Sequence, residues 1–124
     1  FQITGDFTGA DIQQTLNDAL GERQPDLVIS DLAPNLSGVQ SVDQAAMEDL
    51  VIAASRFAWS CLKPKGVLVA KLFEGSHAMG VRNQISCLFR DCQIRKPPAS
   101  RSHSAEIYLV TGGPIRQTIT PLAP

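Results

Sequence analysis

The chain has 124 residues, of which 44% are hydrophobic, with a mean hydropathy of 0.00 and a formal net charge of −1. This length suits one globular domain with a buried core and is too short for two domains. No apolar run approaches the roughly 18 residues of a membrane span, and no basic-then-apolar signal is visible at the amino terminus. We therefore expect no membrane partner and a reducing compartment, the cytoplasm or, in a eukaryote, the mitochondrion. Cys61, Cys87 and Cys92 are interpreted as reduced core residues there.

Charge is distributed unevenly along the chain. Residues 1–55 hold nine acidic residues and one basic residue, whereas residues 56–124 hold ten basic and three acidic residues. Many of the basic side chains lie between Lys63 and Arg101, at a density that suits contact with a phosphate backbone. The alternative is an ordinary solvated face of helices and loops.

Apolar periodicity and turn residues predict alternating helices and strands. Residues 1–4 read as a short strand, and the helix that follows is expected to be capped by Thr8 and stopped by Gly21. Ser41 and Gln44 have the spacing of a capping box at the start of the longest helix. The predicted elements are helices over 10–20, 43–62 and 78–89 and strands over 27–31, 66–73, 92–96 and 107–110.

The predicted strand over 27–31 leads to the first candidate functional residue. Leu27, Val28 and Ile29 form a continuous apolar run, typical of a strand buried on both faces, and Asp31 follows closely. Pro34 disfavours helix at the residue before it, so a loop comes next. Ligands of open α/β sheets bind beyond the carboxyl ends of the strands, which is where this carboxylate stands.

Two further ionisable residues are expected at the same edge of the sheet. Lys71 lies near the end of the second buried strand. Only about ten residues, rich in Pro and Ser, separate the last two strands, which is too few for a parallel crossover, so these strands should form an antiparallel hairpin. The reversal places Glu106, at the start of the last strand, beside Asp31 and Lys71.

A lysine held between two carboxylates can stabilise an alkoxide or, if it is partly desolvated, accept a proton, and both roles suit activation of a hydroxyl group. The structural alternative is an ion-pair network that tolerates a lysine in a buried strand. No catalytic triad order, zinc-protease motif, Walker loop or dinucleotide fingerprint is present in the sequence. His77 and His103 are interpreted as ordinary surface residues.

Three runs in this sequence resemble one enzyme family. SDLAPNLSG (30–38), VLVAKLFEG (67–75) and RKPPASRSHSAEIYLV (95–110) look like the corresponding runs of the FtsJ-type ribose 2'-O-methyltransferases, and their order and spacing also fit. The resemblance implies an α/β, Rossmann-like fold that uses S-adenosylmethionine. Its sheet is mainly parallel, with an antiparallel last strand.

The resemblance also implies roles for single residues. Lys71 would be the principal catalytic group that activates the ribose hydroxyl, with Asp31 and Glu106 orienting it. Asp6 and Phe7 would hold the adenine of S-adenosylmethionine, the methyl donor, and Asp31 would lie near that donor. No metal is expected, since the donor carries its own positive charge.

The function implied is methyl transfer to a ribose of large-subunit ribosomal RNA, with the RNA or the large ribosomal subunit as partner. Alternatives are a ribose methyltransferase that acts on transfer RNA or a messenger cap, and a non-catalytic RNA-binding module. The residues expected to contact RNA phosphates are Arg82, Arg95, Lys96 and Arg101.

The sequence also departs from the family pattern. The first catalytic lysine of the family, the Gly-rich donor loop and the acidic residue for the donor ribose have no counterpart here. We therefore expect a partial methyltransferase domain over 1–113, lacking its amino-terminal strands and inactive alone, and an extended or disordered tail over 114–124. The strand over 27–31 would then form an exposed edge that self-associates, pairs with a partner or promotes aggregation.

Overall fold

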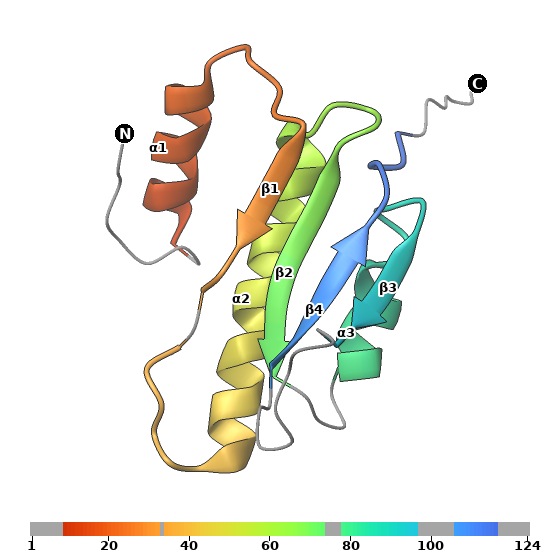
Figure 1. The fold of residues 1–124 in the computed structure, drawn as a ribbon. Helices are drawn as coiled ribbons and strands as arrows, with labels where there is room; N and C mark the ends of the chain where they lie inside the picture. Colours follow the sequence, from red (N-terminus) through yellow and green to blue (C-terminus); the bar gives the residue numbers. More distant parts are fainter. Residues whose placement is uncertain (1–8, 33, 74–77, 97–105, 117–124) are drawn as a thin grey trace, which may run out of the picture.

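We describe the protein from a computed structural model, which covers residues 9–32, 34–73, 78–96 and 106–116. Three helices and four strands lie in these ranges (Figure 1). In chain order they are α1 (Ala10–Leu20), β1 (Leu27–Ser30), α2 (Gln40–Cys61), β2 (Val67–Phe73), α3 (Ala78–Ile85), β3 (Cys92–Arg95) and β4 (Glu106–Thr111). The strand expected over residues 1–4 and the predicted cap at Thr8 lie outside the described residues.

The four strands form one sheet in the order β1-β2-β4-β3. β1 and β2 are parallel, from Leu27 opposite Val67 to Ser30 opposite Ala70. β4 is antiparallel to both of its neighbours, β2 and β3. The predicted hairpin of the last two strands is therefore confirmed, as is the mainly parallel sheet with an antiparallel last strand.

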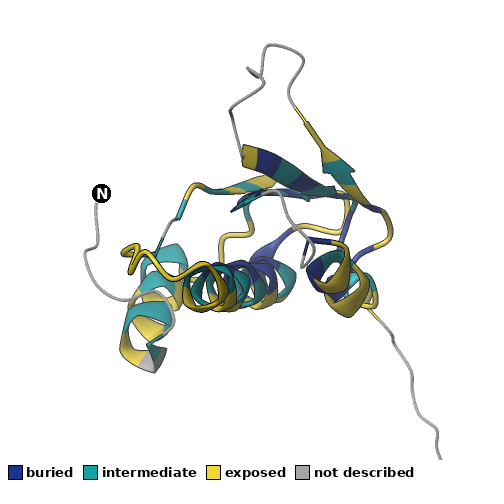
Figure 2. Cartoon of the chain, turned by 90° about the horizontal axis from the view of Figure 1, so that it is seen from below, coloured by how far each residue is buried: buried dark blue, intermediate teal, exposed yellow. Residues whose placement is uncertain are grey.

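The core lies between the sheet and the helices, which occupy one side of it (Figure 2). Alternation along β2 sends Leu68, Ala70 and Leu72 into this core, where they form one cluster with Met47 and Val51 of α2. Val67, Val69 and Lys71 alternate with them and point to the opposite face of the sheet, whereas Phe73 at the strand end packs against the core. Within the described ranges, no helix covers that face.

Two predicted helix boundaries are wrong. α2 begins at Gln40, with Val39 as its N-cap residue and no side-chain cap, so the expected capping box of Ser41 and Gln44 does not form. The polar contact that organises this helix start comes instead from Asp43, as described below. α3 ends at Ile85 rather than at residue 89, because the chain turns there, with the amide of Leu88 donating to the carbonyl of Ile85.

The prediction that β1 is buried on both faces is also wrong. Val28 packs against the core, but Leu27 and Ile29 are exposed on the other face. β1 is the last strand of the described sheet on its side, so its outer edge pairs with no described strand. Within the described ranges, the expected exposed apolar edge is therefore observed.

The segment after β4 packs against the end of α2. Pro114 is buried and forms an isolated bridge with Phe89, and the indole Nε1 of Trp59 donates to the carbonyl of Ile115 at 3.0 Å. The guanidinium of Arg116 stacks over the Trp59 ring, 4.5 Å from its centroid. Residues 114–116, the start of the expected tail, thus contact the domain.

The cysteines differ in their surroundings. Cys61 and Cys92 are buried, as expected, and burial raises the pKa of both thiols. Cys87 is exposed, which corrects its assignment to the core, since it lies in the turn that ends α3. No helix in the described part of the chain has the length and apolar character needed to cross a membrane.

Candidate active site

The sheet brings the three predicted site residues together. Asp31 directly follows β1, whose last residue, Ser30, lies opposite Ala70 of β2, the residue before Lys71. Glu106 begins β4, opposite Phe73 and two residues along β2 from Lys71. A parallel pair and an antiparallel neighbour thus place two carboxylates on either side of one lysine, as the sequence predicts.

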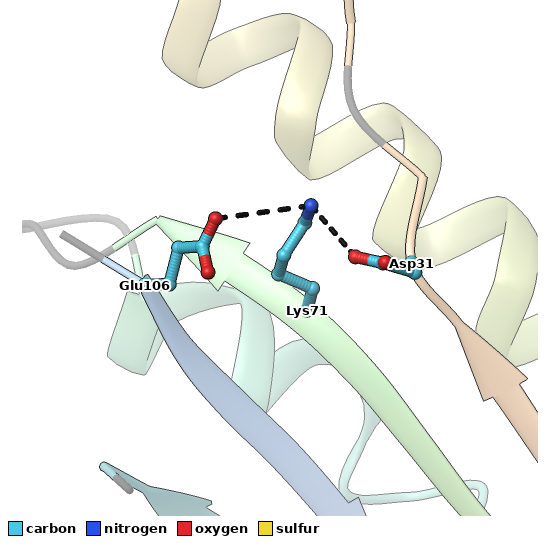
Figure 3. Close-up of polar contacts among 3 residues, drawn as sticks. All are labelled: Asp31, Lys71 and Glu106. Atoms are coloured by element: carbon cyan, nitrogen blue, oxygen red, sulfur yellow. Dashed lines mark ion pairs between the residues drawn. The ribbon is translucent and has the colours of Figure 1, made fainter. Parts of the chain in front are cut away.

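The lysine side chain contacts both carboxylates (Figure 3). The distance from Lys71 Nζ to Asp31 Oδ1 is 2.7 Å, a short charge-assisted hydrogen bond, and that to Glu106 Oε2 is 3.9 Å. The Lys71 side chain is 13% exposed, whereas that of Asp31 is 73% exposed. The lysine is therefore held in place inside the cluster, while Asp31 remains open to a ligand.

The hydrogen bond to Asp31 raises the pKa of Lys71 above its ordinary value, against the opposing effect of partial burial. Lys71 is consequently an ammonium ion at neutral pH. Of the two roles considered for it, stabilisation of an alkoxide needs this charged form. Acceptance of a proton would require Lys71 to lose its proton first, which Asp31 opposes.

Tyr108 is a site residue that the sequence reasoning missed. It lies directly opposite Lys71 in the β2–β4 register, on the same face of the sheet. The signal was present, because Tyr108 is two residues after Glu106 and residues at that spacing share a strand face. Placing Tyr108 beside Lys71 requires the pairing register of β2 and β4, which the sequence alone does not give.

Asp43 is the second missed residue. Its Oδ1 accepts hydrogen bonds from the amide and the hydroxyl of Ser37, both at 2.8 Å, and its Oδ2 accepts one from the amide of Gly38 at 3.2 Å. The bonds from Ser37 lower the pKa of Asp43 below 3.8. Asp43 therefore fixes the end of the loop that begins at Asp31.

Several predicted residues lie outside the described ranges. These are the proposed donor contacts Asp6 and Phe7, the proposed RNA contact Arg101, and both histidines, His77 and His103. Their assignments remain predictions.

The other predicted RNA contacts lie around β3. Arg95 and Lys96 are exposed, and Arg95 lies opposite Tyr108 in the β3–β4 register, in one cross-strand row with Lys71. Arg82 is different, because its Nε donates to the carbonyl of Cys92 at 2.9 Å and thereby ties α3 to β3. Arg95 and Lys96 thus have side chains at the surface near the cluster, whereas Arg82 has a structural contact.

The charges of Asp31 and Lys71 suit a site that binds an organic cation beside a hydroxyl group. In the described ranges, no group of three His, Cys, Asp or Glu residues is arranged to hold a metal ion. The exposed carboxylate of Asp31, at the sheet edge, suits a positively charged group such as a sulfonium. The ammonium of Lys71, beside it, suits an oxygen that becomes negative during a reaction.

Comparison with known proteins gives consistent matches. A family model described as FtsJ-like methyltransferase matches residues 1–113. The chain is 45% identical over 108 residues to ribosomal RNA large subunit methyltransferase E of Azoarcus sp. (strain BH72), covering 87% of this chain and 53% of that protein. Identity to the protein of the same name from Stutzerimonas stutzeri is 43% over 111 residues, covering 90% of this chain and 54% of that one. The chain thus spans about half the length of these curated relatives.

A solved structure shares the fold. A Plasmodium falciparum protein described as a ribosomal RNA methyltransferase superposes with a TM-score of 0.75 at 20% identity, covering 93% of this chain and 64% of that chain. The fold, the matched residues and the identity to the curated relatives agree with one another. This chain belongs to the FtsJ-like methyltransferase family.

Proposed function

We propose that the protein transfers a methyl group from S-adenosylmethionine to a ribose 2'-hydroxyl of large-subunit ribosomal RNA. The observation that carries the proposal is the ammonium of Lys71, held 2.7 Å from Asp31 and 3.9 Å from Glu106 at the edge of the sheet. Membership of the methyltransferase family supports the donor, and the names of the bacterial relatives support the acceptor and a cytoplasmic location.

The cluster would act on the acceptor oxygen. Donation of a hydrogen bond from Lys71 to the ribose 2'-oxygen would stabilise the negative charge that develops as this oxygen attacks. The donor supplies an electrophilic methyl group, and its sulfur keeps the electron pair of the broken bond. The hydroxyl proton, more acidic as the new bond forms, passes to a neighbouring carboxylate or to water. Asp31 and Glu106 position Lys71 for this contact.

Among the described residues, Asp31 is the one that we propose to contact the methyl donor. The exposed Asp31 carboxylate would lie near the sulfonium, and Asp6 and Phe7 are retained as proposed adenine contacts. For the acceptor, we propose that Arg95 and Lys96 contact RNA phosphates, because both are exposed next to the row that contains Lys71.

We also propose that the outer edge of β1 pairs with another strand, from a second copy or a partner. Leu27 and Ile29 are exposed, and an apolar edge strand is a template for pairing. Sedimentation of residues 1–124 tests this idea, and a monodisperse monomer over a wide concentration range would contradict self-association.

The decisive experiment measures transfer of labelled methyl groups to undermethylated large ribosomal subunits. The complete protein, its Lys71→Ala variant and residues 1–124 alone are compared, with Lys63→Ala as the control, since Lys63 pairs with Asp26 away from the cluster. We expect loss of activity by about 10²-fold or more for Lys71→Ala and little change for Lys63→Ala.

Other results would redirect the proposal. Methylation of transfer RNA or capped RNA, but not of large subunits, would change the acceptor. Salt-dependent RNA binding that survives Lys71→Ala, with no methyl transfer by the complete protein, would favour a non-catalytic RNA-binding module. Undiminished transfer by Lys71→Ala would refute the role of this lysine.

A further inference from the structure

The connection from β1 to α2 and the first turn of α2 together carry three large apolar side chains in solvent. Leu36 is 67% exposed, and Val39 and Val42 are each 53% exposed. Single exposed apolar residues are common and need no explanation, but here three lie within seven residues of one another. We name residues 35–42, of which 40–42 form the start of α2, the apolar loop.

The apolar loop has a fixed shape. Three hydrogen bonds to Asp43 hold Ser37 and Gly38, and the hydroxyl of Ser37 in turn accepts a hydrogen bond from the amide of Val39 at 3.1 Å. Gly38 has a φ of 89°, a conformation that suits glycine. The loop therefore presents its apolar side chains without needing a ligand to order it, which lowers the entropic cost of binding.

The apolar loop follows Asp31 of the cluster closely along the chain. Leu36 is five residues beyond Asp31, so the chain between them can span at most about 18 Å. Figure 1 shows this connection leaving the carboxyl end of β1 and reaching α2 beyond the end of the sheet at which β2 also ends. The connection thus starts at Asp31, which is itself paired with Lys71.

The chemistry of the apolar loop suits the face of a nucleobase. The sequence has no Lys or Arg between Arg23 and Arg56, so the apolar loop itself carries no cation with which to attract a phosphate. Unstacked bases in single-stranded RNA expose flat apolar faces that pack against protein side chains.

We propose that the apolar loop packs against a base of the acceptor RNA, next to the nucleotide whose ribose lies at Lys71. Leu36 and Val39 are the contact residues, and Asp43 is a positioning residue that holds the loop in shape. The inference rests on the proposed function, because it assumes an RNA acceptor.

The test compares Leu36→Ser and Val39→Ser with Met79→Ser in the complete protein. Met79 is a similarly exposed apolar residue on α3, so its variant controls for loss of surface hydrophobicity. On protein-free large-subunit ribosomal RNA, we expect KM to rise about fivefold for each loop variant, with kcat within about twofold of wild type and no change for Met79→Ser. Acceptor RNA with an abasic site beside the methylated nucleotide should remove the difference between wild type and the loop variants.

The role of Asp43 is tested with Asp43→Asn against Asp49→Asn, an exposed carboxylate on the same helix. We expect Asp43→Asn alone to speed hydrogen exchange at the amides of Ser37 and Gly38 and to raise KM as the loop variants do. Faster exchange with an unchanged KM would leave Asp43 a purely structural residue and overturn its positioning role.

Several outcomes would overturn the main proposal. They are an unchanged KM in both loop variants, an equal rise for Met79→Ser, or a defect on assembled subunits but not on protein-free RNA, which would place a ribosomal protein on the loop. If the wild-type protein transfers no methyl group, the proposed function fails. The Kd for RNA, measured on the same variants, then still tests the contact.

Discussion

The ion pair between Lys71 and Asp31 gives the sharpest prediction, which a double-mutant cycle with Lys71→Met and Asp31→Asn measures. At 2.7 Å, two unit charges attract by about 1.5 kcal/mol in bulk water and by about 6 kcal/mol at an effective dielectric constant near 20. Asp31 is 73% exposed, so solvent screening brings the attraction close to the lower of these two energies. We expect a coupling free energy of about 1 kcal/mol.

The assay is urea unfolding at pH 7 of the wild type, both single variants and the double variant. The exposed pair of Lys63 and Asp26, at 3.3 Å, gives a matched control cycle that should show a smaller coupling. Because the pKa of Lys71 is raised above 10.5, its coupling should be unchanged between pH 7 and pH 9 and should be lost only as the pH rises through that raised pKa. A coupling no larger than that of the control pair would refute the inference that Asp31 holds the lysine.

Three further perturbations test the fold around the site. A Cβ at Gly113 would overlap the carbonyl oxygen of Pro64, so Gly113→Ala should displace the segment after β4 and lower the thermal midpoint, detected by circular dichroism. Leu109→Ala removes a fully buried side chain of β4 and should cost about 3 kcal/mol, lowering the midpoint by on the order of 10 °C, whereas Val110→Ala on the half-buried face should cost less. The lowered pKa of Asp43 stabilises the fold above pH 3.8, and this contribution is lost as the pH falls through the folded-state pKa. Asp43→Asn should therefore lower the urea midpoint at pH 7, and the difference from wild type should shrink as the pH falls through that pKa.

The candidate site could be predicted because each of its members has a local signal. Asp31 follows an apolar run, Lys71 interrupts another, and the short segment before Glu106 permits only an antiparallel return. Tyr108 was missed because its place beside Lys71 depends on the register between two strands far apart in sequence.

Helix boundaries were predicted less well, because local motifs competed with contacts between residues farther apart in the sequence. Ser41 and Gln44 have capping-box spacing, yet Asp43 binds the loop before the helix, and α2 begins before Ser41. The apolar periodicity after Ile85 continues, but Phe89 pairs with Pro114 instead of extending α3. In both cases a specific hydrogen bond or bridge outweighed the small helical preference of single residues.

The sequence by itself determined the order of strands and helices, the antiparallel return of the last strand and the three residues of the ion-pair cluster. Each of these depends on chain connectivity and on the period of apolar residues, which are local properties. Only the tertiary structure decided that Leu27 and Ile29 are exposed, that Arg82 ties α3 to β3, and that Asp43 fixes the apolar loop. These features depend on which elements cover which face and on pairings between distant residues, and neither is encoded in local periodicity.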